Sequence, residues 1–510
     1  MESTRRSALW RRPRWRVVSL VATAAAGAAL LAGGGAPAGG VAATGAPVPA
    51  GRPNVVFVLT DDLSWNLLQY MPHVRELRRA GSTFTDYTVT DSLCCPSRSS
   101  ILTGRFPHNT GVFTNSAPDG GFGVFHGRGE EAQTFATGLQ AAGYRTAMMG
   151  KYLNGYQPAA TQGGATPYVP PGWNEWDVAG NGYPEFDYTL NENHALVHYG
   201  HRPQDYLTDV IAGKGAAFIA DSAAAGTPFL LELATFAPHA PYTPAPRDAA
   251  DFPGLRAPRG PAFDRLPTDA PSWLAGRAPL TPRETAAIDT GFRQRVRAVQ
   301  AVDDMVGTLR ATLRTAGVAD DTYLVFSSDN GYHMGEYRLN PGKMTAFDTD
   351  IRVPLVVTGP GVPAGRTRTE PVENVDLAPT FLALGAAAVP AAVDGRSLVP
   401  LLHGAQAPGW RDAALVEHHG PDLDNADPDR PAPHSGNPTS YKAIRTTTGT
   451  YVEYSTGERE YYDRARDPNE LHNVAAQLPA SKLAQLHATL DALRHCSGTA
   501  ACWSAAHVTN

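Results

Sequence analysis

The sequence lacks the excess of basic residues that proteins binding nucleic acid carry. Its 510 residues contain 43 Lys and Arg against 49 Asp and Glu, which gives a formal net charge of −6 at pH 7. A chain of this charge has no general attraction for a polyanion, so we expect no nucleic-acid partner. Short-period repeats are also missing after residue 50. The roughly 460 residues that follow are enough for one large domain with a smaller companion.

A long apolar segment that would serve as a stable membrane anchor is missing as well. The charge-free run at residues 17–31 is short, rich in Ala and Gly, and preceded by six arginines. Basic residues, a short apolar core and small residues such as Ala38 and Ala43 are typical of a signal peptide. We therefore expect residues 1–43 to be cleaved during export, by the Sec or the twin-arginine route, and the protein to be secreted. Cleavage would move the formal charge from −6 to about −11. A retained anchor is the alternative.

Cysteine is scarce, with four residues in the chain. If all four were bridged in an exported protein, three pairings would be possible. Cys496 and Cys502 lie close together near a polar C-terminus, which favours a local disulfide. Cys94 and Cys95 are neighbours, and a vicinal disulfide is strained and rare. This second pair therefore needs another explanation.

Three short apolar runs have the composition of buried parallel strands, because they are rich in Val, Leu, Ile and Phe without strict alternation. The runs are residues 55–59, 229–236 and 323–326. Polar residues with metal-binding or acid-base capacity follow each run, namely Asp61 and Asp62, then His239, then Asp329 and Asn330. Ligands of open α/β sheets bind beyond the carboxyl ends of the strands. We expect these side chains to converge on one site.

The remaining patterns predict two parts of unequal size. Apolar residues recur every three or four positions over residues 283–315, which indicates an amphipathic helix packed on a sheet. Residues 242–282 are rich in Pro and charge and indicate a long surface excursion. After residue 402, alternating aromatic residues and a helical pattern at 481–495 favour a small antiparallel sheet with a closing helix. We predict an α/β catalytic domain at 50–405 and a smaller subdomain at 406–510.

The most specific motif is Cys94-Cys95-Pro96-Ser97-Arg98, followed by Leu102-Thr103-Gly104-Arg105. It resembles the signature of the sulfatase family, Cys-X-Pro-Ser-Arg followed by Leu-Thr-Gly-Arg. The resemblance implies that a formylglycine-generating enzyme oxidises Cys94 to Cα-formylglycine (3-oxoalanine). Proline suits the start of a helix and glycine its end, and the free amides of the first turn favour an anion. The alternative is an ordinary helix preceded by two buried thiols.

The resemblance implies a hydrolase that cleaves sulfate monoesters in two covalent steps. One hydroxyl of hydrated formylglycine attacks sulfur and expels the alcohol, and the other collapses to the aldehyde and releases sulfate. A divalent cation would activate the hydroxyl and polarise the sulfate. The metal ligands that match the family segments are Asp61, Asp62, Asp329, Asn330 and the hydroxyl derived from Cys94. Oxygen donors suit a hard cation; calcium is the family expectation, and magnesium or manganese stays open.

The resemblance also assigns cationic residues to the sulfate. Arg98, Lys151 and Lys343 match the sulfate-binding positions of the family. Three Asp against one divalent ion leave a charge of about −1, and these three cations bring the pocket to about +2 before a monoanionic sulfate ester enters. His239, in Pro238-His239-Ala240-Pro241, matches the histidine that protonates the leaving oxygen.

One position departs from the family pattern. Many sulfatases have a histidine two residues after the lysine that corresponds to Lys151, where it assists the second hydroxyl, whereas this chain has Leu153 followed by Asn154. The base for the elimination step is therefore unassigned. His333 is one candidate for this base. The alternative is that His333 only lines the wall of the site and takes no part in the reaction.

The segment Lys151-Tyr152-Leu153-Asn154-Gly155-Tyr156 resembles the branch that contains N-acetylglucosamine-6-sulfatases and extracellular glucosamine endosulfatases. The resemblance implies an alkaline-phosphatase-like α/β sandwich and a sulfated carbohydrate or aryl sulfate as substrate. Two alternatives stay open. One is a phosphomonoester or phosphonate hydrolase of the same superfamily; a phosphomonoesterase would want a second metal. The other is a non-catalytic binder of sulfated glycans, which predicts an unmodified Cys94.

Overall fold

The computed structural model describes residues 51–425, 427 and 429–508. The predicted signal peptide, residues 1–43, lies outside these residues. Within the described part, no helix is both long and apolar enough to cross a membrane.

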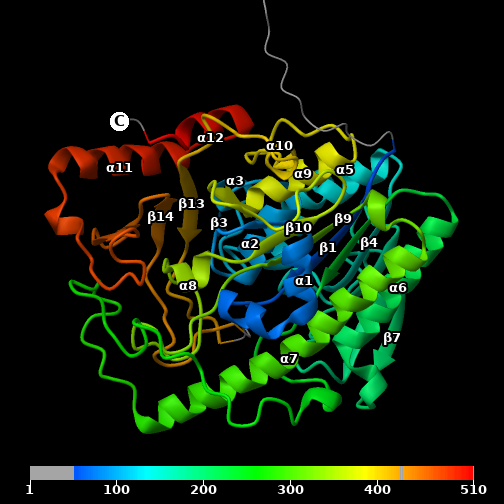
Figure 1. Ribbon diagram of the computed structural model, residues 1–510, viewed down its shortest axis with the longest axis horizontal. Coiled ribbons are helices and arrows are strands. Elements are labelled where there is room, and N and C mark those ends of the chain that lie inside the picture. The colour runs from blue at the N-terminus through cyan, green and yellow to red at the C-terminus, as the bar shows by residue number, and fades with distance from the viewer. Residues whose placement is uncertain (1–50, 426, 428, 509–510) are drawn as a thin grey trace, which may run out of the picture. The chain divides into compact units, whose positions relative to one another are not determined.

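The described residues form a large mixed sheet of ten strands, whose central strands are parallel (Figure 1). In spatial order the strands are β11 (Arg366–Arg368), β2 (Ser82–Phe84), β10 (Leu355–Thr358), β9 (Thr322–Ser328), β1 (Asn54–Thr60), β8 (Phe229–Ala234), β4 (Arg145–Lys151), β5 (Glu175–Ala179), β6 (Tyr188–Glu192) and β7 (Ala195–Tyr199). Strand β10 is antiparallel to β9, and β6 and β7 are antiparallel at the other edge. The three predicted runs are β1, β8 and β9, which lie side by side.

Helices cover both faces of this sheet, as the side chains of β1 show. Val55, Phe57 and Leu59 belong to a cluster with α2 (Cys94–Thr103), α5 (Phe135–Ala141) and α9 (Leu377–Leu384). Val56 and Val58 belong to the opposite cluster, with α1 (Pro72–Ala80), α6 (Leu207–Ala224) and α7 (Pro282–Thr315). A strand buried on both faces reads as a continuous apolar run, which is why strict alternation is missing. The predicted α/β sandwich is confirmed.

Helix α7 is the predicted long helix, and its start is encoded locally. The Thr281 side chain accepts a hydrogen bond from the Glu284 amide at 3.2 Å, and the Glu284 carboxylate accepts one from the Thr281 amide at 2.8 Å. Pro282 occupies the first helical position. This capping box satisfies free amides of the first turn and sets where the helix begins.

A second, antiparallel sheet follows at the C-terminal side, as predicted. Its strands are β13 (Ala413–His418), β14 (Tyr441–Thr446), β15 (Gly449–Tyr454) and β16 (Arg459–Asp463). The closing helix is α11 (Ala480–Leu493), which shares a core cluster with β13, β14 and β15. The division into residues 50–405 and 406–510 stays a prediction.

The remaining described elements are short. They are α3 (Pro107–Thr110), α4 (Gly121–Gly127), α8 (Asp348–Ile351), α10 (Val399–Leu402), α12 (Thr499–Ala505), and the two-stranded pair β3 (Tyr87–Thr88) and β12 (Val372–Glu373).

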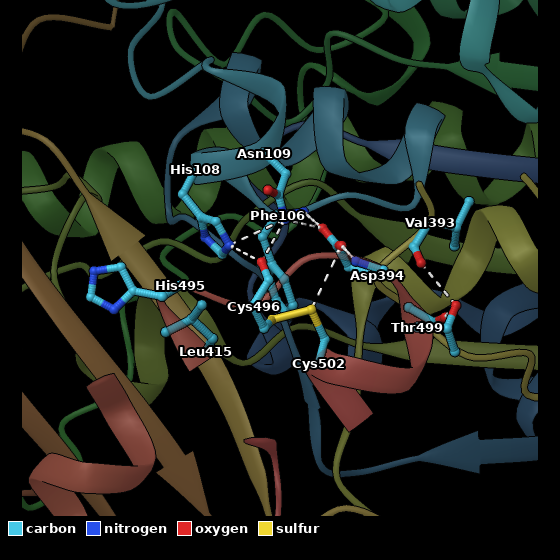
Figure 2. Close-up of a disulfide and its surroundings, with 12 residues drawn as sticks. Phe106, His108, Asn109, Val393, Asp394, Leu415, His495, Cys496, Thr499 and Cys502 are labelled. Atoms are coloured by element: carbon cyan, nitrogen blue, oxygen red, sulfur yellow. Dashed lines mark hydrogen bonds between the residues drawn. A yellow bond between two sulfur atoms is a disulfide. The ribbon is translucent and has the colours of Figure 1, made fainter. Parts of the chain in front are cut away.

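The predicted disulfide between Cys496 and Cys502 is confirmed (Figure 2). The backbone oxygen of Cys496 accepts a hydrogen bond from Asn109 at 2.9 Å and lies 2.8 Å from the ring Nε2 of His108. Asp394 accepts hydrogen bonds from Asn109 and from the Gly498 amide. The disulfide-bonded turn is thereby joined to α3, which follows the helix of the cysteine motif.

Replacing Glu232 with glutamine should flatten the pH dependence of stability. Glu232 lies in the central strand β8, is 2% exposed, and its Oε2 has no hydrogen-bond partner among the described residues. Burial raises the pKa of its carboxyl to about 7, from an ordinary 4.5. The folded state therefore holds this proton more tightly, so the free energy of unfolding falls as pH rises from about 4.5 to about 7, by roughly 3–4 kcal/mol.

The measurement is urea denaturation of both proteins at pH 5 and pH 8. Glu232→Gln should gain stability relative to wild type at pH 8 and little at pH 5. If Glu232→Gln changed the free energy of unfolding by the same amount at pH 5 and at pH 8, the raised pKa of the Glu232 carboxyl would be contradicted.

Candidate active site

The predicted metal ligands come together where β1 and β9 end. The two strands are parallel with Thr60 opposite Ser328, so the residues that follow each strand emerge at the same edge. The Asp62 amide donates to Asp329 Oδ1 at 3.2 Å, and Asn330 Nδ2 donates to Asp62 Oδ1 at 2.6 Å. Asp61, Asp62, Asp329 and Cys94 are buried, and each offers one ligand atom within 4.8 Å of the others.

The donor chemistry of this cluster fits a hard divalent cation. Burial and the neighbouring Asp61 raise the pKa of Asp329, which reflects carboxylates packed together away from water. A cation would offset that repulsion, and carboxylate and amide oxygens are its preferred ligands. The Asn330 Oδ1 lies 3.6 Å from Cys94 Sγ, on the same side as the carboxylates. Asp61, Asp62, Asp329 and Asn330 are the residues that would hold the ion.

Asp62 is held in an uncommon backbone conformation. Its φ of 63° lies in the left-handed region, which side chains other than glycine rarely adopt. The Arg295 guanidinium, itself buried, binds the Asp62 carbonyl oxygen. Such conformations persist where the surrounding structure fixes them, and they cluster at functional sites. Here the conformation turns the chain so that both Asp61 and Asp62 face the cluster.

Cys94 is the first residue of α2, where the free amides of the first turn concentrate positive potential. Its Sγ lies 3.2 Å from Asp61 Oδ1 and 2.9 Å from Lys343 Nζ. Cys95 belongs instead to a hydrophobic cluster, and neither cysteine is disulfide-bonded. The two neighbouring thiols therefore sit in different environments, one among charged groups and one in the core.

The three predicted cationic residues surround Cys94. Arg98 donates to Asp329 Oδ2 at 2.8 Å and to the Lys151 carbonyl oxygen at 3.0 Å. Its remaining terminal nitrogen, NH2, has no hydrogen-bond partner in the part of the chain that the structure describes. Lys151 Nζ lies 2.5 Å from Asp61 Oδ2, and Lys343 Nζ lies 2.8 Å from Asp62 Oδ1. All three are nearly fully buried. Their roles stay a prediction.

His239 follows β8 and faces the same cluster. Its Nδ1 lies 2.7 Å from the Ala240 carbonyl oxygen, and its Nε2 contacts the Asp429 carboxylate and lies 3.6 Å from Asp62 Oδ2. Both ring nitrogens therefore lie within hydrogen-bond distance of an oxygen atom. Burial opposes protonation, but the carboxylates of Asp429, Asp62 and Asp61 outweigh it and raise the pKa of His239.

Asp429 is the site residue that the sequence did not reveal. Its carboxylate is buried, contacts His239, and lies 2.9 Å from Lys343 Nζ. With this carboxylate the predicted pocket charge of about +2 falls to about +1. An Asp in a segment rich in Pro and Asp carries no motif, so no sequence signal would have found it. A pocket of about 300 Å³ opens beside Asp62, His239, Lys343 and Asp429.

His333 does not face Cys94. Its Nδ1 lies 2.9 Å from Asp350 Oδ2, and its Nε2 lies 2.9 Å from the Ser435 carbonyl oxygen. Both ring nitrogens are thus engaged in the wall of the site, which favours the reading of His333 as a wall residue. Leu153 lies in the hydrophobic core, and Asn154 donates to Asp429 at 3.0 Å.

Comparison with known proteins agrees with this geometry. Residues 53–387 match the family model of the sulfatases. The chain belongs to the sulfatase family. Residues 335–496 of this sulfatase also match a model described as the C-terminal part of N-sulphoglucosamine sulphohydrolase. The enzyme is therefore a sulfuric ester hydrolase, as predicted.

Two relatives and one solved structure are informative. N-acetylglucosamine-6-sulfatase of Homo sapiens is 34% identical over 475 residues, which cover 88% of this sulfatase and 85% of the relative. The extracellular sulfatase SULF-1 homolog of Drosophila melanogaster is 37% identical over 72% of this chain and 33% of its own. A structure solved with its substrate D-glucosamine-2-N,6-O-disulfate has a TM-score of 0.71 at 25% identity, covering 86% and 97% of the two chains.

A phosphonate monoester hydrolase from Silicibacter pomeroyi has the same fold, with a TM-score of 0.64 at 23% identity over 85% of this sulfatase and 93% of that chain.

Proposed function

We propose that this sulfatase hydrolyses sulfate monoesters of sugars, glucosamine 6-sulfates first among them, and also cleaves aryl sulfates in assays. The observation that carries the proposal is the position of Cys94, at the N-terminus of α2 and in contact with both Asp61 and Lys343. The substrate class is supported by the relative named N-acetylglucosamine-6-sulfatase and by the structure that holds a disulfated glucosamine.

The proposed nucleophile is Cys94 after oxidation to Cα-formylglycine by a formylglycine-generating enzyme. Its hydrate carries two hydroxyls on one carbon. One hydroxyl loses its proton and its oxygen bonds to sulfur, while the bond from sulfur to the alcohol oxygen breaks. The second hydroxyl then loses its proton, the bond from carbon to the sulfate oxygen breaks, and the aldehyde re-forms with release of sulfate. Two easier displacements replace one difficult hydrolysis.

The surrounding residues divide the remaining work. We assign sulfate binding to Arg98, Lys151 and Lys343, because each has a charged nitrogen beside Cys94 or its carboxylate neighbours. We assign to His239 the donation of a proton to the alcohol oxygen as that oxygen leaves, because its ring faces the cluster and the surrounding carboxylates raise its pKa. Asp61, Asp62, Asp329 and Asn330 would hold a divalent ion, calcium by family expectation, which would lower the pKa of the nucleophilic hydroxyl and polarise the sulfate.

A single ion is proposed, although a second group of possible ligands exists. Asp62, His239 and Asp429 also offer ligand atoms close to one another. The ammonium of Lys343, however, lies 2.8 Å from Asp62 and 2.9 Å from Asp429 and already supplies the positive charge between them. A two-metal phosphomonoesterase would need that position for its second ion. This argues for sulfate esters over phosphate monoesters.

We also propose secretion after removal of residues 1–43, and a smaller subdomain at 406–510 that contributes Asp429 to the catalytic domain at 50–405. The relative from Drosophila that is named an extracellular sulfatase supports the first point. The start of the antiparallel sheet at Ala413 supports the second.

A panel of esters tests the function. Protein produced in a host that converts Cys94 should release inorganic sulfate from N-acetylglucosamine 6-sulfate and from an aryl sulfate. Its kcat/KM for the aryl sulfate should exceed that for the matching aryl phosphate and aryl phosphonate by at least about 100-fold, because the site is built for a monoanion and one metal ion. Faster phosphate or phosphonate hydrolysis would overturn the proposal. A Cys94 peptide with its thiol intact, together with no turnover, would indicate the non-catalytic binder.

A further inference from the structure

The described residues of the connection between β13 and β14, which are 419–425, 427 and 429–440, include Asp429, whose carboxylate lies in the active site. Hydrogen bonds join this connection to the part of the chain that carries the large sheet. The Asn340 amide donates to the His434 carbonyl oxygen at 2.9 Å, and Asn115 Nδ2 donates to Asp429 Oδ2 at 2.8 Å. The position of Asp429 is therefore set by the catalytic domain as well as by the strands on either side of the connection.

The Asp429 carboxylate is fully occupied by hydrogen-bond donors. Its Oδ1 contacts His239 Nε2 and lies 2.9 Å from Lys343 Nζ. Its Oδ2 accepts from Asn115 at 2.8 Å and from Asn154 at 3.0 Å. Four donors match the four lone-pair positions of a carboxylate. No acceptor position is left for a substrate hydroxyl, so direct recognition of the sugar is not what this group is placed to do.

A negative charge here weakens the attraction for an anionic substrate. The carboxylate lies next to the ammonium that is assigned to the sulfate, and it reduces the positive charge of the pocket. A buried carboxylate beside groups assigned to an anion implies a compensating benefit. The benefit that the geometry offers is a shared anchor for His239 and Lys343.

We propose that Asp429 is a positioning residue that fixes the orientation of the His239 imidazole and of the Lys343 ammonium at the same time. This inference rests on the proposed function, because it acts through the residues assigned there. Interactions that orient reacting groups lower the barrier without strengthening substrate binding. Removing the charge should therefore slow turnover and tighten binding together.

The test compares Asp429→Asn with wild type on two substrates. For N-acetylglucosamine 6-sulfate, whose alcohol is a poor leaving group, kcat should fall about 100-fold and KM should fall about 3-fold. For an activated aryl sulfate, which needs no proton on its leaving oxygen, kcat should fall by less than about 5-fold. Asp429→Glu should recover part of the loss on the sugar, since it restores the charge.

Asp427→Asn is the matched control. Asp427 lies on the same segment and accepts from Asn115 at 3.3 Å and from the Asp429 amide, but neither His239 nor Lys343 is among these partners. This variant should stay within about 3-fold of wild type on both substrates, which separates loss of the anchor from general disturbance of the segment.

A double-mutant comparison shows whether Asp429 acts through His239. Once His239→Ala has removed the imidazole, adding Asp429→Asn should widen the difference between sugar and aryl substrates by less than about 3-fold. Equal losses of Asp429→Asn on both substrates, or a rise in KM, would overturn the inference. Failure of the proposed function looks different, because wild type itself would then release no sulfate from either substrate.

Discussion

Cys94→Ala should lose sulfate release altogether, by at least about 10⁴-fold in kcat, while the protein stays folded. The substitution removes the thiol that must be present for Cβ to be oxidised to the aldehyde, so residue 94 stays a methyl group, and no other side chain at the site can form a geminal diol. Cys94 is buried at the start of α2, and its loss deletes one small side chain from a polar cluster, not from the apolar core. The thermal midpoint should therefore change little. The measurements are sulfate release and thermal denaturation of the purified variant.

Cys95→Ala is the control for Cys94→Ala. Cys95 is equally buried and adjacent, but it packs in the hydrophobic cluster. Its variant should keep at least about a third of the wild-type kcat and lose about 1 kcal/mol of stability to a small cavity. Residual turnover by Cys94→Ala above one per cent, or equal inactivation by Cys95→Ala, would contradict the assignment of the nucleophile.

Cys94→Ser separates the two chemical steps. A serine offers one hydroxyl, so it can accept a sulfuryl group but has no second hydroxyl to expel it. We expect at most one sulfuryl group per protein molecule, found by mass spectrometry on the peptide that contains residue 94, and no steady-state turnover.

The parts of this site that the sequence predicted are those whose positions follow from local rules. Asp61, Asp62, Asp329 and Asn330 follow two apolar runs, and parallel strands place the ends of neighbouring runs at one edge. Pro96 lies in the first turn of the helix of the cysteine motif, which runs from Cys94 to Thr103, and Gly104 follows its last residue. The continuous apolar composition of β1 likewise predicts that this strand is buried on both faces.

Asp429 and His333 were beyond the reach of such rules. The place of Asp429 depends on its contacts with Asn115, His239 and Lys343, all of which are far away in sequence. His333 is close in sequence to the metal ligands, yet its ring turns to Asp350 and the Ser435 carbonyl oxygen. Proximity along the chain sets where a backbone runs, but partners distant in sequence decide where a polar side chain points.

Removing divalent cations should abolish activity, by at least about 10³-fold, and lower the stability of the enzyme. Asp61, Asp62 and Asp329 are buried with ligand atoms within 4.8 Å of one another. Lys151, Lys343 and Arg98 offset their three formal charges, but these cations are also the groups assigned to the sulfate of the substrate. A bound cation stabilises the folded state by about 2.7 kcal/mol when its free concentration is 100 times its Kd. Dialysis against a chelator should therefore lower the thermal midpoint, and calcium should restore it.

Asp329→Asn is the variant that ties this effect to the predicted site. Loss of one carboxylate should weaken calcium binding, so the rise in thermal midpoint on adding calcium should be much smaller than in wild type. Asp427 lies outside the cluster, so Asp427→Asn should keep the full rise. Binding measured by calorimetry should give one ion per chain. Two ions per chain would instead mean that Asp62, His239 and Asp429 bind a second ion and displace Lys343, which would revive the phosphomonoesterase alternative. Full activity and an unchanged thermal midpoint in the chelated enzyme would refute the metal site itself.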